Sequence, residues 1–311
     1  MPANGSLNFY SNFMQYRQLG SSALTISVIG FGCMSLEPEQ AVTNSLLHEA
    51  VASGINYFDT ADLYQQGFNE EMVGKALKGK RKNVVIATKA GNQLKPGGDG
   101  WEWNPRKEYI LSAVDKSLRR LQTDYIDLYQ LHGGTIDDPI DDTIAAFEQL
   151  VQQGKIRYYG ISSIRPNVIR EYVKRSNIVS VMMQYGLLDR RPEEECLALL
   201  QQNNIGVLAR GSLAKGLLAG KTPAAFLTYT AAEVSKMAGA VARHSSIDRS
   251  PAATAIQYVL GNPALTSAIT GIRTIEQLRE LVQVSGASGL TPAERTMLQE
   301  TLPANLYTEH R

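Results

Sequence analysis

The stretch YIDLYQLHGGTIDDPIDDTIAAFEQLVQQGKIRYYGIS, residues 125–162, contains two short apolar runs on either side of an amphipathic segment. Residues 125–132 and 156–162 are rich in Ile, Leu and Tyr on both faces, as expected for buried parallel strands. Between them, residues 143–151 place apolar side chains at helical spacing, and Pro139 stands where a helix would open. The stretch therefore predicts a strand–helix–strand unit whose two strands are parallel.

The same alternation recurs along the whole chain. The predicted strands are 27–32, 56–60, 83–89, 125–132, 156–162, 179–185, 205–210 and 266–271. Eight such units favour closure into an α/β fold of the (β/α)8 TIM-barrel type, with a short N-terminal hairpin at Tyr16–Ile26. An open Rossmann sheet is the alternative. Its dinucleotide-binding motif matches poorly. Gly30-Phe-Gly32 is not followed by the third glycine, and no Asp or Glu stands where it would bind the ribose of the dinucleotide.

The bulk composition limits the classes of function. Residues 14–311 are predicted to form one barrel domain, and residues 1–13 to be a disordered extension or an expression remnant. Lys and Arg number 31 and Asp and Glu 30, which gives no reason to expect nucleic acid or a membrane as partner. Cys33 and Cys196 form no CxxC pattern, and neither a signal peptide nor a bilayer-spanning run is recognised. A cytoplasmic protein with free thiols is expected.

Polar side chains stand at the carboxyl ends of three successive predicted strands. Asp59, Lys89 and His132 each close an otherwise apolar run, and Tyr64 lies in the loop after Asp59. A barrel presents its active site at the carboxyl ends of its strands, so we expect these four side chains to converge.

This set suits proton transfer to an oxygen. A free phenol has a pKa of about 10, and a nearby ammonium lowers it by favouring the phenolate. A carboxylate keeps that ammonium charged, and an imidazole can bind a substrate oxygen. Taken singly, His132 reads as an ordinary polar residue and Asp59 with Lys89 as a structural ion pair. The combination with Tyr64 favours chemistry. No zinc or iron ligand spacing occurs, so no metal is predicted.

These residues lie in segments that resemble signatures of the aldo-keto reductase superfamily. The resemblance runs from Tyr16 to about Gln283 and is nearest to bacterial reductases whose substrates are poorly defined. The segments that carry it are Gly54–Tyr64, Asn69–Gly74, Leu118–Leu121, Asp124–Leu128 with His132, Gly154–Ser162 and Gly216–Lys221.

The resemblance implies a catalytic tetrad of Asp59, Tyr64, Lys89 and His132, and NADP(H) held across the barrel mouth without a Rossmann domain. Arg273 and Gln277, at the start of a helix, are the implied contacts of the adenosine 2′-phosphate, which suits a helix N-terminus and a guanidinium. The implied cofactor residues are Gly32, Cys33, Met34, Ser162, Ser163, Gln184, Arg210, Gly211, Ser212, Leu213, Lys215, Gly216, Gly271, Arg273, Gln277 and Glu280.

The chain departs from the family pattern around the nicotinamide. Met182 and Ser163 stand where Gln and Asn usually hold the carboxamide, and Gln184 is the expected substitute. Arg210 replaces the tyrosine that stacks on the ring, and Leu281 replaces an adenine-binding Asn. A guanidinium can stack on the ring or bind the pyrophosphate, and the sequence leaves both roles of Arg210 open.

The expected function is NADPH-dependent reduction of an aldehyde or ketone, with Tyr64 as the proton donor. Two alternatives remain: a Schiff-base aldolase-type barrel that uses Lys89, and a non-catalytic NADPH-binding regulatory module. The partner is a small carbonyl compound. The sequence does not indicate which carbonyl compound this is, since the irregular loop 91–103 and the segment 222–236 contain no motif for a particular ligand. It does not indicate the oligomeric state either.

Overall fold

Eight parallel strands form a closed barrel in the computed structural model, which describes residues 14–97 and 100–311. Around the barrel they are β10 (Ser180–Gln184), β11 (Gly206–Arg210), β12 (Leu265–Gly271), β3 (Ile29–Gly32), β4 (Tyr57–Asp59), β5 (Val85–Ala90), β8 (Ile126–Leu131) and β9 (Ile156–Ser162). Each predicted bound lies within two residues of the observed one, so the predicted strands and the (β/α)8 fold are confirmed. The Rossmann alternative is excluded because the sheet closes through the β9–β10 pair.

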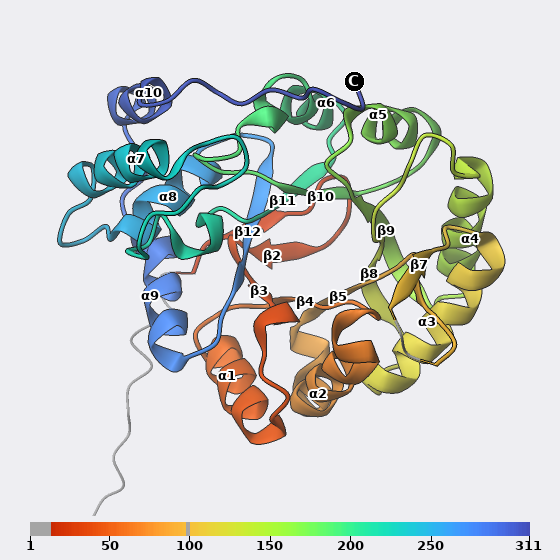
Figure 1. Ribbon diagram of the computed structural model, residues 1–311. Helices are drawn as coiled ribbons and strands as arrows, with labels where there is room; N and C mark the ends of the chain where they lie inside the picture. The colour runs from red at the N-terminus through yellow and green to blue at the C-terminus, as the bar shows by residue number, and fades with distance from the viewer. Residues whose placement is uncertain (1–13, 98–99) are drawn as a thin grey trace, which may run out of the picture.

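Helices surround the barrel on its outside (Figure 1). They are α1 (Gln40–Ala52), α2 (Phe68–Leu77), α3 (Lys107–Leu121), α4 (Ile140–Gln152), α5 (Pro166–Arg175), α6 (Cys196–Gln202), α7 (Ala231–Arg243), α8 (Pro251–Leu260), α9 (Ile275–Gly286) and α10 (Pro292–Glu300). Helices next to the barrel bury one face against the strands, as α4 does with Ile144, Phe147 and Leu150, whereas α10 packs on α7. Pro139 precedes α4 directly, as the sequence predicts.

The strands are buried on both faces, which explains their continuous apolar sequences. Every residue of β5 and β8 is buried. One apolar cluster fills the space between the strands and the helices, and a smaller one fills the barrel interior. Polar side chains at the strand ends are therefore exceptions to the local pattern and stand out in the sequence.

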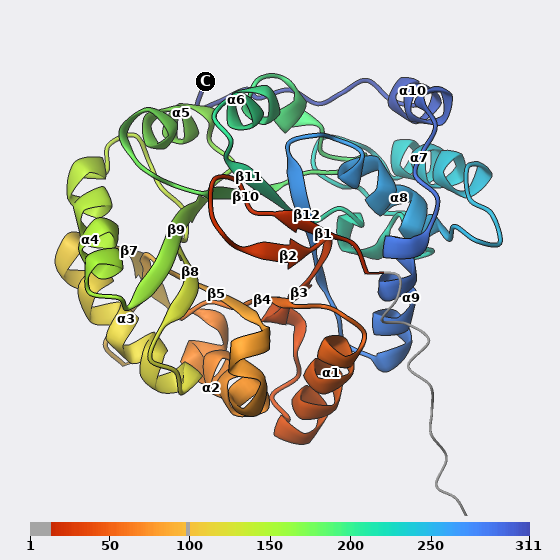
Figure 2. The same ribbon diagram turned by 180° about the vertical axis from the view of Figure 1, so that it is seen from behind.

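The predicted N-terminal hairpin consists of β1 (Tyr16–Gln18) and β2 (Thr25–Ser27), which pair antiparallel. It lies across one opening of the barrel (Figure 2). Leu19, Leu24 and Ile26 of this hairpin belong to the interior cluster. The hairpin thus closes the amino-terminal end of the barrel and leaves the carboxyl end for the site. The predicted extension, residues 1–13, lies outside the described residues.

A second hairpin, β6 (Asn92–Leu94) with β7 (Trp101–Trp103), follows β5 where the sequence indicated an irregular loop. Trp103 packs on Gly91 and Gly133, where an added Cβ would lie 2.7 and 3.0 Å from its ring. Its indole nitrogen donates to Asp138 Oδ1 at 2.9 Å. This hairpin therefore stands beside the strand end that carries His132. Within the described part of the chain, no helix is long and apolar enough to cross a membrane.

Candidate active site

The four predicted catalytic residues meet at the carboxyl end of the barrel. Asp59 ends β4, Lys89 is the penultimate residue of β5, and His132 directly follows β8. Tyr64 begins a 3₁₀ turn in the loop between β4 and α2. The Lys89 Nζ lies 2.5 Å from Asp59 Oδ1 and 5.2 Å from the centre of the Tyr64 ring. The Tyr64 and His132 rings meet edge to face, with centres 5.8 Å apart.

Lys89 and Asp59 form a buried ion pair. The Lys89 side chain has no exposed surface, and it also donates to the Thr60 carbonyl at 2.7 Å. Gln130 Nε2 donates to the second oxygen of Asp59 at 3.3 Å. Burial by itself would lower the pKa of Lys89, but the Asp59 carboxylate and the Tyr64 hydroxyl raise it overall. Lys89 is therefore a charged ammonium held in a fixed place.

The pKa of Tyr64 is raised, although a nearby ammonium by itself would lower it. Burial raises the pKa of the Tyr64 hydroxyl, and the nearby charges of Lys89 and Arg210 oppose that rise without overcoming it. In this structure, Tyr64 therefore holds its proton at neutral pH. The ammonium of Lys89 acts in the expected direction, since it would stabilise the phenolate left after proton donation.

His132 presents a neutral imidazole to the same space. Burial and the charges of Lys89 and Arg210 lower its pKa to about 3. Its backbone is held on both sides, because its N–H donates to Ala90 at 2.7 Å and its carbonyl accepts from Asn92 Nδ2 at 3.0 Å. The buried Nδ1 has no partner among the described residues. A neutral imidazole whose ring lies beside Tyr64 can donate a ring N–H to the oxygen of a small molecule.

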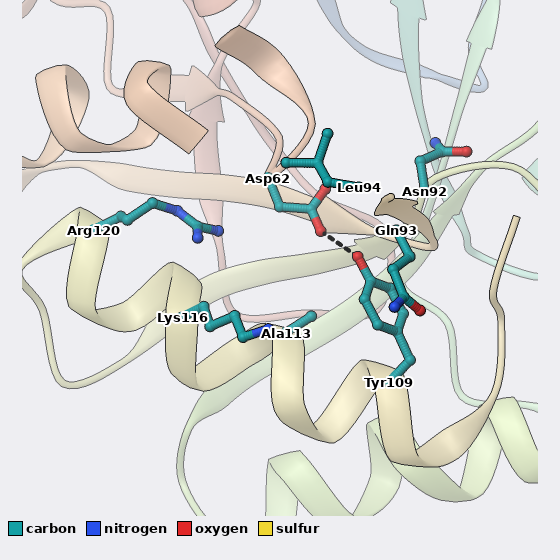
Figure 3. Close-up of a pocket in the computed structure, with 8 residues that line it drawn as sticks. All are labelled: Asp62, Asn92, Gln93, Leu94, Tyr109, Ala113, Lys116 and Arg120. Atoms are coloured by element: carbon teal, nitrogen blue, oxygen red, sulfur yellow. Dashed lines mark hydrogen bonds between the residues drawn. The ribbon is translucent and has the colours of Figure 1, made fainter. Parts of the chain in front are cut away.

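A pocket that the sequence did not indicate lies next to the Tyr64 loop, between β6 and α3 (Figure 3). Its volume is about 120 Å³, and Asp62 points into it. Asp62 Oδ2 accepts from the Tyr109 hydroxyl at 3.0 Å, while its buried Oδ1 has no partner in the described chain. Burial, with a smaller contribution from the Glu70 charge, raises the pKa of Asp62 to about 7. The pocket's lining residues are Asp62, Asn92, Gln93, Leu94, Tyr109, Ala113, Lys116 and Arg120.

Arg210 lies at the mouth of the barrel, at the end of β11. It donates to Gln184 Oε1 at 3.0 Å, so the residue expected to hold a carboxamide is here bonded to Arg210. The charge of Arg210 acts on both Tyr64 and His132. Its guanidinium therefore belongs to the catalytic end of the barrel. The sequence implied that Arg210 contacts the cofactor, but it did not indicate the bond to Gln184 or the effect on Tyr64 and His132.

The implied cofactor residues fall into two groups. Met34, Gly211, Lys215, Gly271, Arg273, Gln277 and Glu280 are exposed, and Gly32, Ser162, Leu213 and Gly216 are partly exposed. Cys33, Ser163 and Ser212 are buried, and their side chains bond to nearby backbone atoms of Phe31, Arg165 and Tyr185. Each of these three side chains is thus already in contact with the protein's own backbone.

The start of α9 has the geometry expected of an anion site. Thr274 caps the helix by accepting from the Gln277 N–H at 3.3 Å. Gln277 Oε1 accepts from the Arg273 N–H at 3.0 Å, so these two residues are arranged as one unit. Glu280, one turn along, accepts from Ser250 at 3.0 Å. The exposed Arg273 guanidinium is thus presented at a helix N-terminus.

Three comparisons place this geometry among known proteins. The model described as "Aldo/keto reductase family" matches residues 28–302. The uncharacterized oxidoreductase YqkF of Bacillus subtilis is 52% identical over 307 residues, which cover 96% of this chain and 100% of that protein. The aldo-keto reductase yakc [NADP(+)] of Schizosaccharomyces pombe is 34% identical over 214 residues, 66% of this chain and 62% of that protein.

Among solved structures, aldo-keto reductase AKR11C1 from Bacillus halodurans is similar throughout. Its holo form gives a TM-score of 0.91 at 51% identity, and its apo form gives 0.83 at 49%. Both matches cover 96% of this chain and 99% of that one. The matched family region contains all four residues that meet at the barrel mouth. The chain is an oxidoreductase that belongs to the aldo-keto reductase family.

Proposed function

We propose that the protein reduces an aldehyde or ketone to an alcohol with NADPH, and that Tyr64 donates the proton. The family acts on small carbonyl compounds. The observation that carries the finer proposal is the meeting of Tyr64, the Lys89–Asp59 pair and the neutral His132 at one barrel mouth. A proton donor, its charge stabiliser and an oxygen-binding group thus surround one space.

The residues around the mouth suit a phosphate-bearing dinucleotide. Arg210 at the end of β11, Lys215 in the loop that follows it, and Arg273 after β12 are exposed cations, and the start of α9 adds a helix N-terminus. When bound, the reduced nicotinamide supplies hydride to the carbonyl carbon. The preference for NADPH over NADH rests on Arg273, which can pair with a 2′-phosphate. The name of yakc includes NADP(+), and AKR11C1 has a holo form.

Each side chain then has a distinct task. Neutral His132 holds the carbonyl oxygen through a ring N–H, because its low pKa keeps the imidazole uncharged in the working range. Tyr64 carries its proton before the reaction and donates it to that oxygen as negative charge develops there. Lys89 stabilises the resulting phenolate, and Asp59 keeps Lys89 charged and oriented.

The aldolase alternative fits the site less well. A Schiff-base lysine must reach the substrate as a neutral amine, which requires a lowered pKa. Lys89 is fully buried, is paired with Asp59 and has a raised pKa. Incubation with carbonyl compounds and borohydride should therefore leave the protein mass unchanged. A trapped adduct at Lys89 would support the aldolase instead. Steady turnover of any carbonyl would exclude the regulatory module.

The proposal is tested by NADPH oxidation with sugars, dicarbonyls and aromatic aldehydes, for the wild type and for Tyr64→Phe. Removing the phenol while keeping the ring should slow turnover by roughly 10²–10⁴-fold. The NADPH dissociation constant should barely change, since the proton donor is not the assigned phosphate contact. Near-normal turnover in Tyr64→Phe would refute the role of Tyr64.

A further inference from the structure

Two consecutive residues after Tyr64 adopt left-handed backbone conformations. Gln65 has φ 49° and ψ 38°, and Gln66 has φ 57° and ψ 33°. Side chains with a Cβ rarely occupy this region, because the Cβ approaches the backbone, and glycine is the usual choice. Strain of this kind persists only where the surroundings enforce it, and it is often found at functional sites. The loop that carries Tyr64 is therefore held in place by other contacts.

Two side chains join this loop to the neighbouring segment after β3. Within the loop, the Gln65 amide donates to the Leu36 carbonyl at 2.8 Å. In the first turn of α2, directly after the loop, Asn69 accepts from the Thr60 hydroxyl at 2.7 Å and donates to the Cys33 carbonyl at 2.9 Å. The segment Cys33–Leu36 thus serves as a common anchor for the Tyr64 loop.

Glutamine at position 65 makes a contact that glycine could not make. Glycine would relieve the backbone strain, but it has no amide with which to reach Leu36. Gln66 has the same backbone conformation and, like Gln65, is exposed, but its side chain makes no hydrogen bond among the described residues. The two glutamines can therefore be compared directly. Both have a strained backbone, but only Gln65 bonds to Leu36.

We propose that Gln65 is a positioning residue, whose bond to Leu36 holds the Tyr64 hydroxyl at a fixed spacing from the segment Cys33–Leu36. Gly32, Cys33 and Met34 are among the proposed cofactor contacts. The bond would therefore keep the Tyr64 hydroxyl at the correct distance from the cofactor and from the substrate carbonyl that lies between them. This inference rests on the proposed function, in which Tyr64 is the proton donor.

The test compares Gln65→Gly and Gln65→Glu with Gln66→Gly. Glycine at either position relieves the same strain, whereas glutamate keeps the size of Gln65 but replaces its N–H donor by a charged carboxylate, which the Leu36 carbonyl oxygen repels. We expect Gln66→Gly to turn over like the wild type. Both Gln65 variants should oxidise bound NADPH in a single turnover about 10- to 100-fold more slowly, since small misplacements at a reacting centre have effects of this size. All three melting temperatures should stay within about 2 °C of the wild type, because the expected stability changes are small.

A second measurement separates positioning from damaged folding. With NADPH deuterated at the transferred position, the kinetic isotope effect on kcat should rise in both Gln65 variants, because the chemical step becomes more fully rate-limiting. A smaller fraction of folded enzyme would lower kcat and leave the isotope effect unchanged, and that result would overturn the proposal. Normal kinetics in Gln65→Glu would overturn it as well. If Tyr64→Phe is inactive while the Gln65 variants are normal, only the positioning role fails; if Tyr64→Phe is active, the proposed function fails first.

Discussion

Arg210 places a second cation, besides Lys89, close to Tyr64 and His132 at the barrel mouth. It extends from the end of β11 toward Gln184, and its charge acts on Tyr64 and His132. A planar guanidinium in this place can stack on the nicotinamide. The oxidised ring is positive and the reduced ring is neutral, so a neighbouring cation disfavours only the oxidised form.

Replacing Arg210 with Tyr therefore tests how the two redox forms are distinguished. The ratio of the NADP⁺ to the NADPH dissociation constant should fall by about 3- to 10-fold, the size expected for one partly screened charge contact. Fluorescence titration of both forms gives the ratio. If the two constants worsen together and the ratio stays the same, Arg210 binds the pyrophosphate and does not face the ring.

At the scale of elements, the proposed preference for NADPH rests on the start of α9. Replacing Arg273 with Ala removes a guanidinium from a helix N-terminus, where a charge-assisted contact is worth roughly 1.5–3 kcal/mol. Binding of NADPH should weaken by about ten- to a hundredfold, and binding of NADH should change little.

Arg279→Ala is the matched control, because Arg279 lies on the same helix, is exposed and faces Glu49 at 3.6 Å. It should leave both dissociation constants within about twofold of the wild type, since a surface ion pair of this kind contributes little. If Arg273→Ala weakens the binding of NADPH and of NADH equally, Arg273 does not bind the 2′-phosphate.

At the scale of the whole molecule, Asp62 couples folding to pH. Its pKa is about 7 in the folded protein because of burial and the Glu70 charge, against about 3.9 in an unfolded chain. Below pH ~4 both states hold the proton. As the pH rises from about 4 to about 7, the unfolded state releases the proton first, so the free energy of unfolding falls, and above about 7 the loss is complete.

Asp62→Asn removes this dependence and keeps an acceptor for Tyr109. The variant should be more stable than the wild type by at most about 4 kcal/mol at pH 8, and by at most about 1.5 kcal/mol at pH 5. Urea unfolding at both values measures the difference, with Asp137→Asn as the control at an exposed carboxylate. A stability difference that does not grow with pH would mean that Asp62 is already ionised at pH 5.

The sequence alone was sufficient for the barrel and for the residues that meet at its mouth. Strand and helix periodicity is local, and an apolar run that ends in Asp59, Lys89 or His132 can be recognised without knowing what lies opposite. Parallel strands bring their carboxyl ends to one face, so the convergence followed from topology. The separate hairpin β6–β7 was missed because its two three-residue strands flank the glycine-rich segment 95–100, so that the whole stretch reads as an irregular loop.

Only the tertiary structure decided the properties that depend on burial and on contacts between distant segments. Asp62 meets Tyr109 across 47 positions and Gln65 meets Leu36 across 29, distances over which no local pattern extends. The neutral state of His132 depends on how deeply the fold buries it beside two cations. Desolvation and electrostatic interaction are set by the whole neighbourhood of a group. The sequence could therefore predict which residues meet at the barrel mouth, but not their protonation states or the contacts that hold them.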